Sequence, residues 1–234
     1  MRYIYMLLLT FFILQPACVG YCANNAIEPA VLSVDGTGKA VSTPDQAIIS
    51  IGVSSHSVNA ETAQNINSQA AMAIKAALLE LGINETDIQT NNYSFNPVYS
   101  TAQNGHSLVD YAVDNNVIVI VNDISLVGNV IDLSLANGAN RINSLDFSLR
   151  DTSQLHKKAM EAAIKDARNK AEIIANSLGH RIIGIKNVTN SEGNVQSRDF
   201  SMMRFSNFAA SNTPISPGSL EVVSNIHIDF ILDN

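Results

Sequence analysis

Histidine is the side chain best suited to bind metal or to transfer protons near neutral pH. The five histidines of this chain are widely spread, with no His-x-x-x-His pair: His56, His106, His156, His180 and His227. A zinc site needs three or four converging ligands, and these usually include a closely spaced pair. We therefore predict no metal site, and we expect His227, on the polar side of an alternating segment, to be a surface residue.

A glycine-rich segment, Gly36-Thr37-Gly38-Lys39, raises the question of phosphate binding. A phosphate-binding loop needs Ser or Thr directly after the lysine, and this chain has Ala40 there. A dinucleotide-binding fingerprint needs a third glycine that opens a helix, whereas an extended segment follows here. We interpret the segment as a glycine turn between two strands.

Nucleophiles and acid–base pairs give no catalytic assignment. No serine stands in a Gly-x-Ser-x-Gly elbow. Acidic and basic residues alternate at a spacing of three or four between residues 157 and 172, which is typical of a solvated helix face. They are Glu161, Asp166 and Glu172 beside Lys157, Lys158, Lys165, Arg168 and Lys170. We predict that the chain is not an enzyme, and we assign no catalytic, cofactor-binding or metal-binding residue and no cofactor.

Residues 1–23 resemble a cleavable secretory signal. A basic start at Arg2 is followed by the apolar run 4–14, which is too short to span a membrane, and Pro16 ends it. Cleavage fits best after Gly20 or Cys22. An alternative is a lipoprotein anchored at Cys18, although Gln15 stands where an aliphatic residue is wanted. Cleavage after Cys22 would remove both cysteines, which would exclude disulfides, Cys-bound metal and thiol peroxidase chemistry.

Residues 24–234 form the predicted mature protein, long enough for one large domain. The whole chain carries a net charge of −7, which argues against nucleic-acid binding because such binding needs Lys and Arg to neutralise phosphates. No second apolar run approaches the length of a membrane-spanning helix, so we expect no integral membrane span after signal cleavage. The predicted location is the periplasm.

Hydrophobic periodicity predicts an α+β fold with the order ββαββαβαββ. Amphipathic helices should pack on one face of a mostly antiparallel sheet. We predict strands over 31–34, 47–53, 88–99, 108–121, 145–149, 181–189 and 224–232, helices over 59–81, 126–135 and 152–178, and a long loop over 191–219. The segments 88–99 and 108–121 should form a long hairpin.

Alanines recur every four residues along the last predicted helix: Ala159, Ala163, Ala167, Ala171 and Ala175. Such small side chains let a neighbouring backbone approach closely. Core packing is the first interpretation of this stripe, and a contact between subunits is the alternative. Met202-Met203-Arg204-Phe205, in the predicted loop, carries adaptable apolar groups that favour association, or is simply part of a disordered loop.

Several short motifs together resemble the SIMPL-domain (DUF541) family, which includes bacterial periplasmic immunogenic proteins and an oxidative-stress defence protein. They run in order along the mature chain: Val34–Gly38, Pro44–Ala47, Gly82, Asp87–Thr90, Asn96–Tyr99, Tyr111–Val113, Asp166–Ala171, Pro214–Gly218 and Phe230–Leu232. The segments 187–189 and 225–227 are more polar than expected of the family. The resemblance implies an envelope location, an α+β fold and large ring-like homo-oligomers, and it carries over no catalytic residue.

We therefore expect an exported, non-enzymatic periplasmic protein that self-assembles and contributes to envelope or oxidative-stress tolerance. Its expected partner is a second copy of the same chain. The alternative is a periplasmic enzyme or ligand-binding protein whose site does not depend on a thiol.

Overall fold

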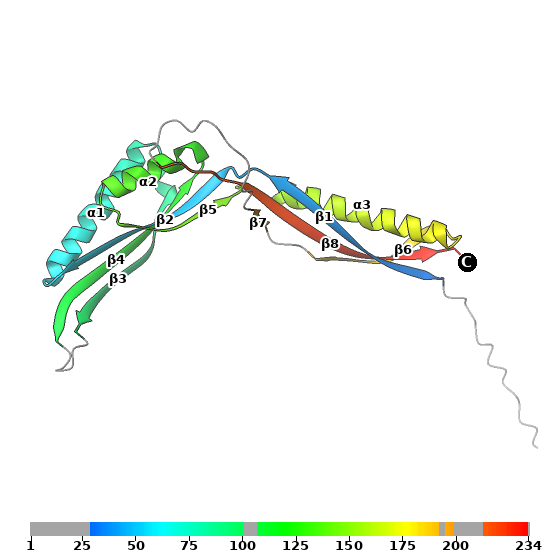
Figure 1. Cartoon of the computed structure of the whole chain (residues 1–234), viewed down its shortest axis with the longest axis horizontal. Coiled ribbons are helices and arrows are strands. Elements are labelled where there is room, and N and C mark those ends of the chain that lie inside the picture. The colour runs from blue at the N-terminus through cyan, green and yellow to red at the C-terminus, as the bar shows by residue number, and fades with distance from the viewer. Residues whose placement is uncertain (1–28, 101–106, 192–194, 199–212, 234) are drawn as a thin grey trace, which may run out of the picture.

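The computed structural model describes residues 29–100, 107–191, 195–198 and 213–233. These residues form an elongated, bent molecule in which two arms meet at an elbow (Figure 1). Each arm is an antiparallel sheet with helices on one face, which confirms the predicted α+β class and, closely, the predicted order of elements. The predicted signal with Cys18 and Cys22, and the segment 202–205, lie outside the described residues.

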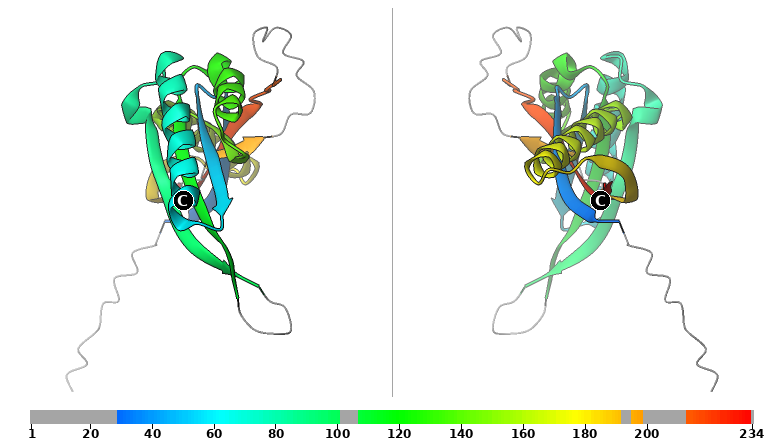
Figure 2. Two further views of the ribbon diagram at one scale, coloured as in Figure 1. Left: turned by 90° about the vertical axis from the view of Figure 1, so that its left-hand side faces the viewer. Right: turned by 90° about the vertical axis from the view of Figure 1, so that its right-hand side faces the viewer.

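The α1 arm contains β2 (Gln46–Ser57), α1 (Ala60–Glu80), β3 (Ile88–Tyr99), β4 (Leu108–Val121), α2 (Val127–Ala136) and β5 (Arg141–Ser148). Its strand order is β3-β4-β2-β5, and each neighbouring pair is antiparallel. The predicted hairpin is the pair β3–β4. The end-on views of Figure 2 show α1 and α2 side by side over this sheet.

The core of the α1 arm follows from strict alternation in β2. Every second residue of this strand is buried beneath the helices, whereas the residues between them line the opposite face. Side chains of β4, α1 and α2 close the same core. The fully buried members include Ala47, Ile49, Ile51, Ile74, Leu78, Val119, Val127 and Val130.

Asn67 occupies a position of α1 that the apolar pattern does not reveal. The pattern predicts Ile66 on the buried face, but Ile66 is exposed, whereas Asn67 is fully buried. Its Nδ2 donates hydrogen bonds to the main-chain oxygens of Val53 (2.9 Å) and Val113 (3.0 Å). Asn67 therefore joins the helix to the two central strands by polar contacts inside an apolar core.

We expect Asn67→Ala to lower the free energy of unfolding by about 1–3 kcal/mol, because the variant loses two buried hydrogen bonds and leaves a gap. Urea denaturation followed by circular dichroism measures this change. The control is Asn65→Ala, an exposed position on the same helix that should change stability little. Equal losses in the two variants would contradict a structural role for Asn67.

The α3 arm contains β1 (Val31–Ser42), α3 (Ser153–Ser177), β6 (Ile182–Ser191), β7 (Val195–Arg198) and β8 (Ser219–Leu232). β8 is central, with β1 on one side and β6 followed by β7 on the other. Helix α3 lies along β1 and β8 and barely reaches β6. This offset leaves one strand of the sheet without a helix above it.

The alanine stripe is the surface by which α3 contacts this sheet. All five alanines are buried, and the first four of them pack with Val34, Ile226 and Phe230 or with Ala40 and Val222. The core-packing interpretation of the stripe is therefore confirmed.

The glycine turn predicted at residues 36–38 is wrong, because β1 continues without a break through these residues. Gly36 and Gly38 face α3 at its alanines. A Cβ atom on Gly36 would lie 2.7 Å from the Ala167 Cβ, and one on Gly38 would overlap the Ala159 carbonyl oxygen and the Ala163 nitrogen. The glycines serve the close approach of helix and strand, not a change of chain direction.

Other boundaries also differ from the prediction, most of all in the predicted loop. β7 lies inside the predicted loop 191–219, and β8 begins at Ser219 rather than near residue 224. The two segments pair with each other from Val195↔Val222 to Arg198↔Ser219. Pairing between distant segments thus creates strands that local alternation does not show.

An ion pair between Asp45 and Arg150 lies at the elbow. The Asp45 carboxylate accepts a hydrogen bond from the Arg150 main-chain nitrogen (2.9 Å) and lies 3.4 Å from its Nε. The Asp45 nitrogen donates to the Ser148 oxygen at 3.1 Å. These contacts join the turn between β1 and β2 to the passage from β5 to α3.

Within the described part of the chain, no helix combines the length and the apolar character needed to cross a membrane.

Candidate functional site

A ladder of polar side chains covers the face of the α3-arm sheet that is turned away from α3. Three directly opposite pairs on β1 and β8 are hydrogen-bonded: Ser33–Asp229 (2.5 Å), Asp35–His227 (2.7 Å) and Thr37–Asn225 (3.1 Å). Asn187, Thr189 and Ser191 of β6 lie opposite the β8 members of these pairs. The sequence shows the alternation on β8, but the pairing of β1 with β8 is what assembles the ladder.

His227 lies at the centre of the ladder between two carboxylates. Its Nδ1 is 2.7 Å from Asp35 Oδ1, and its Nε2 is 3.3 Å from Asp229 Oδ1. The hydrogen bond to Asp35 raises the pKa of His227 above its ordinary value, and the charges of both carboxylates act in the same direction. The pKa of Asp229 is lowered, chiefly by the hydrogen bond from Ser33. His227 is half-exposed, as predicted, but it is engaged on both ring nitrogens.

The chemistry of this cluster differs from that of a serine hydrolase. In a Ser-His-Asp triad the serine donates to the histidine, which acts as a base. Here Ser33 donates to Asp229. An imidazolium held between two carboxylates donates from both nitrogens and has no lone pair with which to take a proton. The arrangement is that of a charged clamp between β1 and β8.

A polar hollow of about 280 Å³ adjoins the clamp. Its lining includes Asp35, Thr37, Thr189, Asn225 and His227. These groups are largely hydrogen-bonded to one another across the strands, so the hollow is a feature of the ladder.

We expect His227→Gln to lower the Tm, and we expect the size of this decrease to depend on pH. Because the folded protein raises the pKa of His227, the stabilisation is fully present below the unfolded histidine pKa of about 6.5. It is lost as pH rises through the higher pKa of the folded state. The difference in Tm between wild type and variant should therefore be largest at about pH 6 and shrink toward about pH 9.

Circular dichroism melts across this range measure the difference. Thr37→Val is the matched control, because it breaks the neighbouring Thr37–Asn225 bond and removes no titrating group. Its Tm deficit should be the same at each pH. A deficit in His227→Gln that does not change with pH would contradict the clamp.

The other described histidines do not converge with His227. His56 is 3.3 Å from Asp110, His180 is 3.6 Å from Asp233, and His156 Nδ1 contacts the Thr152 oxygen at 2.9 Å. Across the described ranges, no group of three or more His, Cys, Asp or Glu side chains could hold a metal ion.

The charged residues of α3 form the predicted pairs four residues apart, and one pair does more than face solvent. Asp166 accepts hydrogen bonds from the Thr37 main-chain nitrogen (2.9 Å) and from Lys170 Nζ (2.7 Å), and Lys170 also donates to the Asp35 oxygen. Lys170 and then the Thr37 N–H lower the pKa of Asp166. The pair thus occupies main-chain groups on the outer edge of β1, which a second strand would otherwise use.

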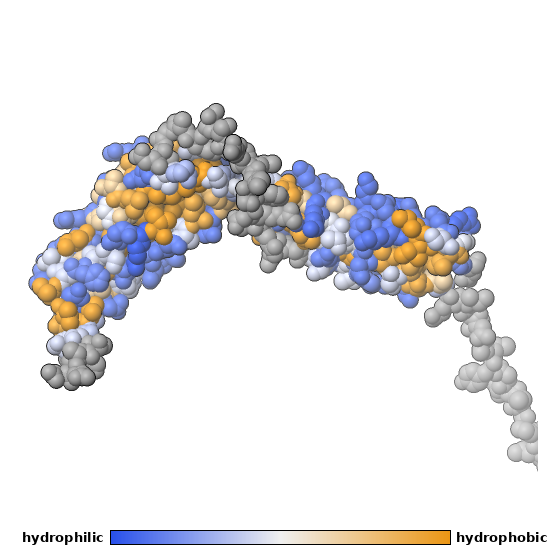
Figure 3. Space-filling view, viewed as in Figure 1, coloured by the Kyte–Doolittle hydropathy of each residue, from blue (hydrophilic) through white to orange (hydrophobic). Residues whose placement is uncertain are grey.

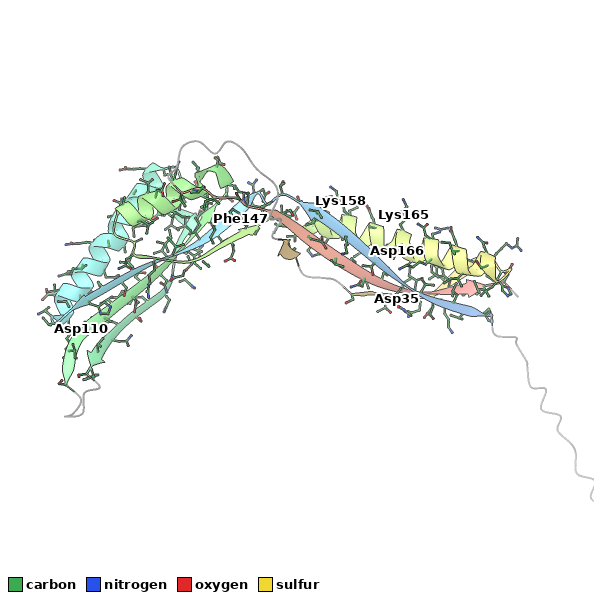
Figure 4. The ribbon with its side chains drawn as sticks, in the orientation of Figure 1. Asp35, Asp110, Phe147, Lys158, Lys165 and Asp166 are labelled. Carbon is green, nitrogen blue, oxygen red and sulfur yellow. The ribbon has the colours of Figure 1, made fainter. Side chains whose placement is uncertain are left out.

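Figure 4 shows how these charges are distributed around α3. Asp166 and Asp35 lie at a similar level along the arm, on helix and strand. Lys158 and Lys165 project from the helix away from the sheet, into solvent.

An open groove of about 430 Å³ runs between α3 and β6. It arises because α3 covers β1 and β8 only. Ile228 and Phe230 of β8 form its floor, Ile164 and Ile185 line its two walls, and charged side chains stand at its rim. Sequence reasoning missed this groove because it depends on the lateral position of the helix over the sheet.

Comparison with known proteins decides the family. The model of the SIMPL family, described as a protein of unknown function (DUF541), matches residues 32–230 of this chain. The chain belongs to the SIMPL family. The predicted resemblance is thereby confirmed. Two SIMPL motifs, Val34–Gly38 and Asp166–Ala171, meet in the contact between β1 and α3.

Two SIMPL relatives illustrate the similarity. The chain is 27% identical over 157 residues to the 26 kDa periplasmic immunogenic protein of Brucella melitensis, and this match covers 65% of this chain and 63% of that protein. It is also 27% identical over 163 residues to YggE of Escherichia coli K12, and this match covers 69% of this chain and 65% of YggE. The chain thus spans a little under two thirds of the length of these relatives. The segments 187–189 and 225–227, which we expected to be more polar than the family pattern, lie in the polar ladder.

Proposed function

We propose that this chain is an exported, non-enzymatic protein of the periplasm that assembles with copies of itself. The observation that carries the proposal is the exposure of large apolar side chains at both ends of an elongated molecule. They gather on the outer half of the β3–β4 hairpin and beside the α3–β6 groove. Grouped apolar side chains of this kind on a soluble protein are typical of association surfaces.

The non-enzymatic part of the proposal draws on the polar ladder. Its histidine, carboxylates and serine are bonded to one another in an order that stabilises the β1–β8 pair and differs from that of a catalytic triad. The location draws on the signal-like residues 1–23 and on a relative whose name describes it as periplasmic. A role in envelope or oxidative-stress tolerance is proposed from the family resemblance.

Size-exclusion chromatography with light scattering, on protein released from the periplasm by osmotic shock, tests the proposal. We expect a mass several times that of one chain at micromolar concentration. A strict monomer would overturn self-assembly. The intact mass of the released protein tests export: it should correspond to cleavage between residues 20 and 23 with no attached lipid, whereas a lipidated Cys18 would establish the lipoprotein alternative.

A ligand-binding function is the second candidate, and the α3–β6 groove favours it. Its volume of about 430 Å³ lies in the range of small-molecule sites, and its floor is apolar. Native mass spectrometry of the purified protein would reveal a retained small molecule. A bound compound that is lost in Ile185→Asp would support this candidate over assembly through the same groove.

A further inference from the structure

The two parts of the chain carry opposite charge. Residues 46–148, which form the α1 arm, contain nine acidic and two basic residues. The described residues of the α3 arm, 31–42, 149–191, 195–198 and 219–233, contain eight acidic and ten basic residues, and eight of the basic but only four of the acidic ones lie in residues 149–191, which supply α3 and β6. In a molecule with a net charge of −7, this asymmetry makes the acidic arm of one copy complementary to the α3–β6 part of another.

The β3–β4 hairpin projects from the free end of the acidic arm (Figure 1). β2 accompanies β4 only as far as the pair Ser57–Tyr111, and beyond it β3 and β4 pair with each other alone. Residues 88–121 contain Asp110 and Asp114 but no Lys or Arg, and these aspartates contact His56 (3.3 Å) and Arg141 (2.6 Å) on neighbouring strands. The large exposed apolar side chains of the hairpin are Tyr93, Phe95, Val98, Tyr99, Leu108 and Val109.

The hairpin is preorganised for binding. Phe95 stacks on Tyr111 across the two strands, with ring centroids 5.6 Å apart. Aromatic pairs of this kind stabilise cross-strand pairing. The apolar side chains of the hairpin should therefore lose little conformational entropy when they bind a partner.

The α3–β6 groove is the concave surface at the other end of the molecule. Ile185 and Val188 are 57% and 51% exposed, although they share a face of the sheet with the buried Phe230 and Ile228. Figure 3 shows hydrophobic surface gathered on the outer part of this arm, among hydrophilic patches. Arg168 and Arg181 stand at the rim, each bonded through Nε to one carboxylate.

The main chain of β6 is poorly suited to receive an added strand. Its pairing with β8 shifts register twice, at residues 183 and 186, and such bulges disrupt the edge of a sheet. The outer edge of β1 is occupied in part by Asp166 and Lys170. Contact at this arm is therefore expected through side chains in the groove rather than through strand addition.

We propose that the β3–β4 hairpin of one copy docks in the α3–β6 groove of the next. This inference rests on the proposed self-assembly and names the two surfaces that carry it. Apolar side chains of the hairpin cover Ile185 in the groove and Val188 beside it, and the negative net charge of the α1 arm favours its approach to the positively charged α3–β6 part. The contact is heterologous, since each copy offers a different surface at each end, so it generates a ring or an open chain.

A complementation experiment tests the pairing. Ile185→Asp places a charge in the groove and leaves the hairpin intact, whereas Tyr99→Asp places one on the hairpin and leaves the groove intact. Each variant alone should lose the assembly and elute as a monomer in light-scattering chromatography. Mixed in equal amounts, they should form a one-to-one complex, because the hairpin of the first fits the groove of the second and neither can extend further.

Three outcomes separate the possibilities. If the wild type assembles and either variant keeps the wild-type mass, the inference is overturned and the proposed self-assembly stands. Two monomeric variants that form no complex when mixed would also overturn the inference. A monomeric wild type overturns the proposed function itself.

Leu135→Asp is the matched control, because Leu135 is 46% exposed on α2 and belongs neither to the hairpin nor to the groove, and its substitution should leave the assembly mass unchanged. Circular dichroism confirms that each variant is folded. If an aspartate variant unfolds, Ile185→Ser and Tyr99→Ser replace it in the same mixing experiment.

Discussion

Gly38→Ala is expected to destabilise the α3 arm by about 3 kcal/mol or more, at the upper end of what overpacking usually costs. The added methyl group would overlap the Ala159 carbonyl oxygen and the Ala163 nitrogen of α3. These are main-chain atoms of a long helix, so no side-chain rotation can relieve the overlap. Helix and strand must move apart, and the buried alanine stripe then loses contact with β1. Chemical denaturation monitored by circular dichroism measures the loss.

Gly184→Ala is the matched control for this prediction. A Cβ atom on Gly184 would lie 3.5 Å from Ile231 Cδ1, which is an ordinary contact. Glycine in a strand also loses more entropy on folding than alanine. The control should therefore be neutral or slightly stabilising. A Gly38→Ala variant as stable as Gly184→Ala would show that α3 does not approach β1 as closely as the structure describes.

Gly36 and Gly38 show where sequence reasoning stops. Their spacing is visible in the sequence, and so is the four-residue repeat of alanines, but nothing in the sequence says that the two features face each other. They are separated by more than a hundred residues. Read locally, two glycines predict a turn. Both glycines take up a strand conformation because β8 pairs with β1 along its whole length and because α3 packs against one face of β1.

Local patterns predict well where a single element determines its own burial. The period of the α1 and α3 segments predicts both helices, β-branched extended runs predict β2 and β4, and alternation predicts the end of β8. β7 and the first residues of β8 depend on each other and therefore escape this reasoning. Asn67 escapes it for a different reason, since the partners of its amide nitrogen are main-chain oxygens of strands that are distant in the sequence.

In the candidate site, too, features set by a single strand could be predicted, whereas features set by the pairing of distant strands could not. The exposure of His227 could be predicted from alternation on its own strand. Its two carboxylate partners could not, because Asp35 becomes its neighbour only through the register of β1 and β8. The α3–β6 groove depends on a lateral offset of one helix over a sheet, which sequence periodicity does not encode. The charge difference between residues 46–148 and 149–191, by contrast, can be counted directly from the sequence.

The two arms have separate cores, and this has a consequence for their stability. One buried cluster lies in the α1 arm, and two smaller clusters lie between α3 and its sheet. The connection at the elbow includes chain crossings, the half-exposed Asp45–Arg150 pair, which contributes little, and the segment before β8, where Thr213 donates to Asp132 and Ile215 packs on the α1-arm core. A large destabilisation of one arm should therefore affect local opening in that arm first.

Leu78→Ala should lower the free energy of unfolding by about 2–5 kcal/mol, because Leu78 is fully buried in the α1-arm core and the variant leaves a cavity. Leu79→Ala, at the adjacent and half-exposed position of the same helix, is the control and should lose much less. Hydrogen exchange measured by mass spectrometry then locates each effect. Leu78→Ala should speed exchange in β2, β4 and α1, and Gly38→Ala in β1 and α3. Equal acceleration in both arms for both variants would show that the elbow transmits unfolding and that the arms form one cooperative unit.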